Sequence, residues 1–246
     1  MTTRMQLVAA ALIAVVSVVV SAAPAGAFAG SQLPYQIRDR FAGASLNPAV
    51  WFTDMQSAGT SQVVQRGSLR LTASSAASSG FHDGILARCQ AVGDFDAQIH
   101  FTLSTWPVGD NVTLAVNAPA LGNTFVESAV GGDVDGLFVQ PSGFITIPRL
   151  PERSGELRLS RRGDLTSAYF RAGATRGTGN SDHASRRGSW RWRSGYARIW
   201  HQIAQFTGSS SPTFVGVAIW NISDFGGQPV SVQVDSFKLD AAGLSC

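Results

Sequence analysis

A strict alternation of apolar and polar residues constrains the fold of this chain more than any other sequence feature. It is clearest in "DFDAQIHFTLS" (94–104). The residues on one side of that segment are Phe95, Ala97, Ile99, Phe101 and Leu103. The residues between them are polar, as in a strand with one face in the core and the other in water. A period of two therefore predicts a half-buried β-strand here.

The same alternation recurs along the chain. The further segments are "NVTLAVN" (111–117), "ELRLSRRGDLTSAYFRAG" (156–173), "FVGVAIW" (214–220) and "PVSVQVDSFKL" (229–239). The second of these predicts a hairpin that turns at Gly163-Asp164. The third is apolar on both faces, as in a central strand, and the last changes parity near Asp235, which predicts a bulge.

Many short strands, abundant turn residues and the absence of helical periodicity indicate an all-β protein. We expect two antiparallel sheets packed as a β-sandwich, with strands connected as a jelly roll. No internal repeat or linker divides the chain, so we expect a single domain over residues 28–246.

The first 27 residues have the layout of a secretory signal peptide. Arg4 precedes an apolar run from Leu7 to Val20, and small residues lead to a cleavage site after Ala27. The run is shorter than the roughly 20 residues of a membrane span, although an uncleaved anchor is the alternative. The sequence therefore predicts a secreted, extracellular protein with no membrane span after processing.

The charge balance argues against nucleic acid as a partner. Removal of Arg4 would reduce the basic count from 19 to 18 against 16 acidic residues, a net charge of +2. A chain this close to neutral has no overall field that would attract a polyanion such as DNA. Nothing in the sequence indicates an oligomer, and we expect a monomer.

Two cysteines, Cys89 and Cys246, stand in a chain that is expected to be exported. An oxidising compartment favours one disulfide between them, which would tie the last residue to the body of the domain. The alternative is a free buried Cys89 and a loose C-terminus.

Five segments, in order, resemble strands of concanavalin A-like lectin/glucanase domains. The first, "RDRFAGASLNPAVWF" (38–52), carries the positions Asp39, Phe41, Leu46, Asn47, Pro48 and Trp51. The others are 67–72, 93–103, 157–173 and 234–239. The chain looks most similar to the non-catalytic jelly-roll modules of secreted bacterial proteins. The resemblance implies a concanavalin A-like jelly roll and does not by itself fix a function.

The carboxylates of a glucanase are missing. Glycoside hydrolysis needs two carboxyl groups across the sugar, which glucanases of this superfamily carry on a Glu-x-Asp-x-(x)-Glu strand. Asp133 and Asp135 share a face but have no glutamate beside them, and no aspartate stands between Glu152 and Glu156. We therefore do not expect a hydrolase of that type.

An alternative, enzymatic interpretation comes from a resemblance to the family 7 polysaccharide lyases. Gln98-Ile99-His100 and the strand from Tyr169 to Gly173, with Arg171 at its centre, are similar to two motifs of that family. The resemblance implies that Gln98 neutralises a uronate carboxyl, that His100 or Tyr169 removes the α-proton, and that Tyr169 protonates the leaving oxygen. The family's arginine motif is matched only by 153–158, which a glycine interrupts and which follows the Gln-Ile-His strand instead of preceding it. We therefore favour a non-catalytic role, with lyase chemistry as the alternative.

The segment "SWRWR" (189–193) has two interpretations. If it is extended, Trp190 and Trp192 lie on one side, and Arg191 and Arg193 on the other. The tryptophans would then either fill the core or lie exposed, where they could stack on sugar rings while the arginines bind carboxylates.

The sequence gives only weak signs of a metal. Related jelly rolls often hold Ca²⁺ near their terminal strands, which makes Asp39 and Asp235 the candidates. Ca²⁺ takes six or more oxygen ligands, and these two aspartates supply few of them. We expect no other cofactor.

These observations predict a secreted jelly roll that binds a polysaccharide, an acidic glycan or another extracellular ligand without catalysis. The alternatives are the uronate lyase and a structural or protein-binding role in the cell envelope. The predicted contacts are Trp190, Arg191, Trp192, Arg193, Gln98, His100, Tyr169 and Arg171.

Overall fold

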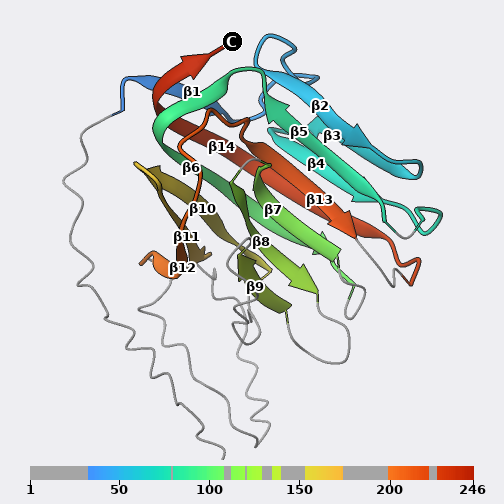
Figure 1. The fold of residues 1–246 in the computed structure, drawn as a ribbon. Helices are drawn as coiled ribbons and strands as arrows, with labels where there is room; N and C mark the ends of the chain where they lie inside the picture. The colour runs from blue at the N-terminus through green and yellow to red at the C-terminus, as the bar shows by residue number, and fades with distance from the viewer. Residues whose placement is uncertain are drawn as a thin grey trace, which may run out of the picture. The chain divides into compact units, whose positions relative to one another are not determined.

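A computed structural model gives the fold (Figure 1). It describes residues 33–78, 80–107, 112–119, 121–128, 135–139, 153–173, 199–221 and 226–246. The strands all belong to one compact unit, Gln32–Cys246. Over the described residues the secondary structure is β-strand, turn and bend, and none of them forms a helix long and apolar enough to cross a membrane.

The described strands form two antiparallel sheets, which confirms the predicted β-sandwich. The eight-stranded sheet has the order β12 (His201–Thr207), β11 (Leu165–Ala172), β10 (Ser154–Arg162), β6 (Gln90–Thr105), β14 (Val230–Ser245), β4 (Ser68–Ala73) and β3 (Thr60–Gln65), with β1 (Tyr35–Asp39) also paired to β14. The six-stranded sheet has the order β2 (Trp51–Gln56), β5 (His82–Ala87), β13 (Gly216–Asn221), β7 (Val112–Ala118), β8 (Gly122–Ser128) and β9 (Asp135–Val139). As predicted, the apolar segment at 214–220 supplies a central strand, β13.

The core lies between the sheets and is filled by the apolar positions that alternation selects. On β6 the buried side chains are Phe95, Ala97, Ile99, Phe101 and Leu103. The inner faces of β7, β10 and β14 contribute Leu114, Val116, Leu157, Leu159, Val232 and Val234 in the same way. The polar residues between those of β6, β10 and β14 therefore point out of the eight-stranded sheet.

The predicted bulge in the last strand is present. The pairing of β14 with β6 shifts register between Val234 and Ser236. Before the shift β14 pairs with β4, and beyond it with β1. The extra residue, Asp235, resets the parity, so that Phe237 returns to the core.

The segment that resembles the concanavalin A-like opening has a structural explanation. One carboxylate oxygen of Asp39 accepts a hydrogen bond from the Phe41 backbone nitrogen at 2.6 Å, and the other accepts one from Trp51 Nε1 at 2.7 Å. The Trp51 indole is buried and meets Phe237 edge to face, with ring centroids 4.8 Å apart. Asp39 thus fixes a buried tryptophan against the last strand.

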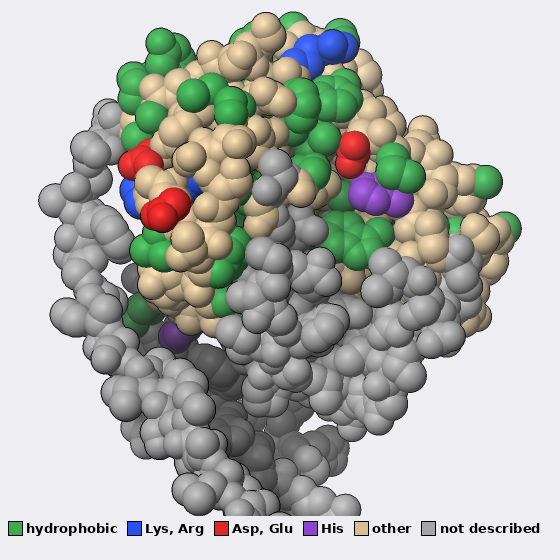
Figure 2. Space-filling view, in the orientation of Figure 1, with side chains coloured by type: hydrophobic (Ala, Val, Ile, Leu, Met, Phe, Trp, Pro, Cys, Tyr) green, Lys and Arg blue, Asp and Glu red, His purple; other side chains and the backbone are tan. Residues whose placement is uncertain are grey.

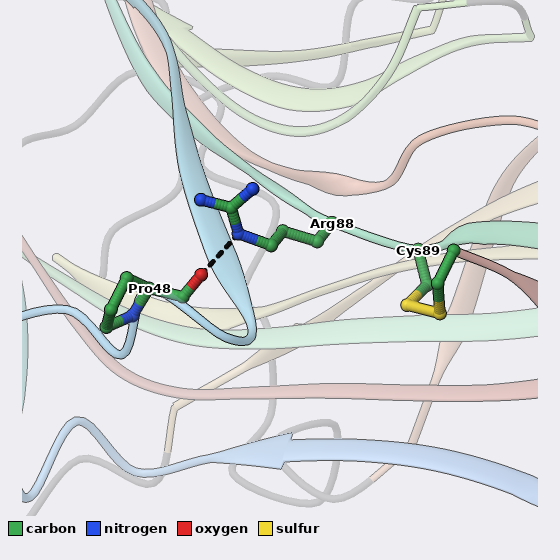
Figure 3. Close-up of a disulfide and its surroundings, with 4 residues drawn as sticks. Pro48, Arg88 and Cys89 are labelled. Carbon is green, nitrogen blue, oxygen red and sulfur yellow. Dashed lines mark hydrogen bonds between the residues drawn. A yellow bond between two sulfur atoms is a disulfide. The ribbon is translucent and has the colours of Figure 1, made fainter.

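The Cys89–Cys246 disulfide is present, which confirms the predicted pairing. It links the residue before β6 to the residue after β14, directly next to the paired residues Gln90 and Ser245. Figure 3 shows the neighbouring Arg88, whose Nε donates a hydrogen bond to the Pro48 carbonyl. The chain's last residue is therefore held covalently to the start of the longest strand pair.

Two charged residues are buried in ways that alternation does not reveal. Arg161 is fully buried and donates to the carbonyls of Gly93 at 2.7 Å and Ser211 at 2.6 Å, and burial lowers its pKa. Asp83 is also fully buried and accepts a hydrogen bond from Gln62 Nε2 at 2.7 Å. Burial raises the pKa of Asp83 to about 6, although the hydrogen bond from Gln62 opposes the shift.

Candidate functional site

The outer face of the eight-stranded sheet carries three rows of directly opposed residues. The first row contains Tyr169, Arg158, Gln98, Lys238 and Arg38. The second row contains Arg171, Glu156, His100 and Ser236. The third row contains Ser167, Ser160, Asp96, Asp240 and Gln36. Every member has a polar or charged side chain, because each stands at an outward position of its strand.

Four residues that the sequence analysis singled out lie in these rows. Gln98 and Tyr169 are in the first row, and His100 and Arg171 are in the second. Arg158 of β10 stands between Gln98 and Tyr169, and Glu156 of β10 stands between His100 and Arg171. From the usual strand spacing and rise, the Cα atoms of His100 and Tyr169 are about 12 Å apart.

One ion pair connects two of the rows, and another lies within a row. Arg158 Nε lies 3.0 and 2.9 Å from the two carboxylate oxygens of Asp96, which also accepts from Gln98 Nε2 at 2.8 Å. In the second row Arg171 pairs with Glu156. The side chains of these two ion pairs are at most 30% exposed, so the face holds its donors and acceptors in defined positions.

Aromatic rings cover one end of the rows. The Arg158 guanidinium lies 5.0 Å from the Tyr169 ring centroid, and that of Arg171 lies 4.6 Å from the Trp200 centroid. Arg158 also approaches Trp200, at 5.6 Å. Such contacts orient the guanidinium groups. Trp200 is part of the candidate site, and its place beside β11 could not be read from the alternation.

His100 has a partner that the sequence analysis did not assign to it. Its Nδ1 lies 2.7 Å from a carboxylate oxygen of Asp235, the residue at the bulge. The two side chains are 40% and 42% exposed, so the pair is open to solvent. A carboxylate only accepts hydrogen bonds, so Nδ1 donates, and Nε2 is the ring nitrogen that is not engaged by Asp235.

The two calcium candidates are not brought together as a metal site. Both oxygens of Asp39 accept hydrogen bonds from the protein, and Asp235 pairs with His100. Within the described ranges, no three His, Cys, Asp or Glu side chains gather in a group that could hold a metal ion. These two aspartates therefore offer few of the six or more oxygen ligands that Ca²⁺ takes.

The predicted contacts of the arginine- and tryptophan-rich segment are Trp190, Arg191, Trp192 and Arg193, and all four lie outside the described residues. Both interpretations of that segment stay predictions. The candidate site rests on the three rows.

The face shown in Figure 2 and the three rows differ in their number of charged side chains. On the face shown in Figure 2, charged side chains are few, and hydrophobic and uncharged ones predominate among the described residues. The three rows, by contrast, contain Arg38, Arg158, Arg171 and Lys238 together with three carboxylates. A hollow of about 500 Å³ lies at the β1, β14, β6 and β10 part of these rows.

The sheet order, the antiparallel pairing and the alternation together define a two-sheet antiparallel β-sandwich, which agrees with the jelly-roll fold that the sequence resemblance implied. No family model and no curated protein matches the chain.

Solved structures share the fold at low identity. An endo-acting O-glycanase structure from human gut bacteria matches with 11% identity and a TM-score of 0.54, over 84% of this chain and 99% of that one. An immunostimulatory antigen and pseudo β-1,3-glucanase of Mycobacterium tuberculosis matches with 11% identity and a TM-score of 0.51, over 87% and 100%. The exoplasmic/lumenal domain of VIP36, bound to Ca²⁺ and a mannose oligosaccharide, matches with 11% identity and a TM-score of 0.50, over 80% and 85%. At these identities the likeness concerns the fold alone.

Proposed function

We propose that this protein is a secreted, non-catalytic jelly roll that binds a carbohydrate on the outer face of its eight-stranded sheet. Gln98 and His100 would be the central contacts, with Tyr169 and Arg171 toward the β11 side. The carrying observation is that these side chains stand in adjacent rows on one polar face, where ion pairs hold their neighbours in place. Pre-organised polar groups lose little freedom on binding a hydroxyl-rich ligand.

Three further observations support the proposal. Solved structures of this fold include a lectin-type domain with bound sugar and a pseudo-glucanase. The Cys89–Cys246 disulfide is compatible with an oxidising compartment outside the cytosol. The N-terminal 27 residues have the layout of a signal peptide.

A glycan array followed by calorimetric titration tests the proposal with protein lacking residues 1–27. We expect binding to at least one polysaccharide, and we expect Gln98→Ala and His100→Ala to weaken it about tenfold each, since each loses roughly one charge-assisted or neutral hydrogen bond. Gln205→Ala is the matched control, because Gln205 lies opposite Ser167 at the far end of the third row. The absence of any glycan ligand, or equal affinity of all three variants and wild type, would reject this assignment.

A second candidate, polysaccharide lyase activity on uronate polymers, is favoured by one contact. Asp235 accepts from His100 Nδ1 at 2.7 Å, which would orient Nε2 as a general base. Against this, the Gln98 amide donates to Asp96 and the Tyr169 ring lies against Arg158.

The absorbance of the unsaturated product separates the two candidates. The lyase requires turnover of a uronate polymer that is lost in His100→Ala and in Tyr169→Phe and is reduced in Asp235→Asn. Binding without turnover supports the non-catalytic assignment.

A further inference from the structure

The hollow on the outer face has walls of unusual charge. It has a volume of about 500 Å³, within the range of roughly 300–1,000 Å³ that suits small-molecule and sugar sites. Three cationic side chains, those of Arg38, Arg40 and Lys238, line it. Gln98, His100 and Ser236 complete the polar part of the wall.

The carboxylates in this wall are already engaged by the protein. Asp39 accepts hydrogen bonds from a backbone nitrogen and from the Trp51 indole, at 2.6 and 2.7 Å. Glu156 pairs with Arg171. Among the described residues, neither acid forms an ion pair with any of the three cations.

The cations, in contrast, have too few acceptors. Arg38 Nη2 and Lys238 Nζ both approach the same carboxylate, that of Asp240, at 3.4 and 2.6 Å, and Arg38 Nε donates a hydrogen bond to the uncharged Gln36 Oε1 at 3.1 Å. The Arg40 side chain is exposed and has no hydrogen-bond or ion-pair partner among the residues that the structure describes. Two cations share one counter-ion and a third has none, which leaves donors free around the hollow.

Such a wall is complementary to an anion that also carries hydroxyl groups. A guanidinium can bind a carboxylate or a sulfate through two parallel hydrogen bonds, and an ammonium adds a point charge. Gln98, His100 and Ser236 line the same hollow as the cations and can contact ring hydroxyls.

We propose that this hollow is a subsite for the anionic group of an acidic polysaccharide, a carboxylate or a sulfate ester, held by Arg40 with Arg38 and Lys238. The inference rests on the proposed carbohydrate binding and adds to it a ligand class and three residues on β1, β14 and the turn after β1. The neighbouring Gln98 and His100 would then contact the same sugar unit.

The test compares three probes on the mature protein by calorimetric titration: polygalacturonate, dextran sulfate and neutral dextran. We expect at least one anionic polymer to bind more than about tenfold more tightly than dextran, and the preference to shrink as added salt screens the charges. The carboxylated and sulfated polymers distinguish the two sources of negative charge.

Variants locate the effect. Arg40→Ala should weaken binding of the anionic polymer about tenfold, which is the loss of one charge-assisted hydrogen-bonded contact. Lys238→Gln should weaken it less, because Asp240 already partly neutralises the Lys238 ammonium at 2.6 Å. Arg162→Ala is the charge-matched control: Arg162 is an exposed arginine on the same sheet that does not line the hollow. Melting temperatures establish that the variants are folded.

The outcomes separate this subsite from the broader function. If neutral and anionic polymers bind equally, or if Arg40→Ala and Arg162→Ala behave alike, the anionic subsite is rejected while carbohydrate binding stands. If no polysaccharide binds, both are rejected.

Discussion

The inner and outer faces of the eight-stranded sheet are built from the same strands but obey different rules. On β6, Ile99 and Phe101 point inward and are at most 1% exposed, whereas Gln98 and His100 point outward. The inner residues contribute to the free energy of folding through their buried apolar area, which depends mainly on side-chain size and little on orientation. The outer residues contribute defined hydrogen bonds and charges. The comparison indicates that the inner face sets stability, and under the proposed function the outer face would set ligand choice.

The largest effect should come from the inner face. Phe101→Ala removes a fully buried ring between the sheets and should lower the free energy of unfolding by about 3–5 kcal/mol. Chemical denaturation measures this. Thr102→Ala, the next residue on the outer side, is the matched control and should cost less than about 1 kcal/mol. Equal losses in the two variants would show that the division between the faces is wrong.

The disulfide should rank next. Replacing Cys89 and Cys246 together by serine opens a link across 157 residues of sequence, and the free energy of unfolding should fall by about 2–5 kcal/mol. The single variants should lose as much as the double variant, because either one breaks the bond. A double variant as stable as wild type would mean that the strand pairing alone holds the C-terminus.

Asp83 tests an inner position that is not apolar. Its folded-state pKa of about 6 lies above its ordinary value of 3.8, so the unfolded chain loses this proton at lower pH. Stability should therefore fall as the pH rises from about 4 to about 7, by at most about 3 kcal/mol, and then level off. Asp83→Asn, which can still accept from Gln62, should remove this part of the pH dependence. Parallel pH profiles of the variant and wild type would contradict the assignment.

The smallest effect on stability should come from the outer rows. Glu156→Gln removes a partly exposed pairing with Arg171 and should change the free energy of unfolding by less than about 1 kcal/mol. Thermal unfolding at low and high salt measures this, and the difference from wild type should shrink in salt. A loss of several kcal/mol would place these pairs among the determinants of the fold.

The two faces also differ in how far they could be predicted. The alternation predicted the core of β6, the hairpin of β10 and β11 and the bulge at Asp235, because apolar burial leaves a regular trace in the sequence. The disulfide was predicted separately, from two cysteines in a chain expected to be exported. It also predicted the outward orientation of Gln98 and His100.

The arrangement of the outer face depends on which strands become neighbours, and the sequence does not encode that locally. Arg38, Lys238 and Gln98 stand in one row although they come from β1, β14 and β6. Asp39, one of the two calcium candidates, accepts a hydrogen bond from Trp51 Nε1, a contact 12 residues away in sequence. Long-range pairing brought the hollow together, so its cations could not be assigned to a site in advance.

Nuclear magnetic resonance titration of the isotope-labelled mature protein, with a polysaccharide identified on the glycan array, tests which surface binds the polysaccharide. We predict shift changes at Gln98, His100, Ser236 and Lys238, including the Gln98 side-chain amide, with β5 and β13 unaffected. Changes confined to the six-stranded sheet, at His82 or Trp220 for example, would contradict the account.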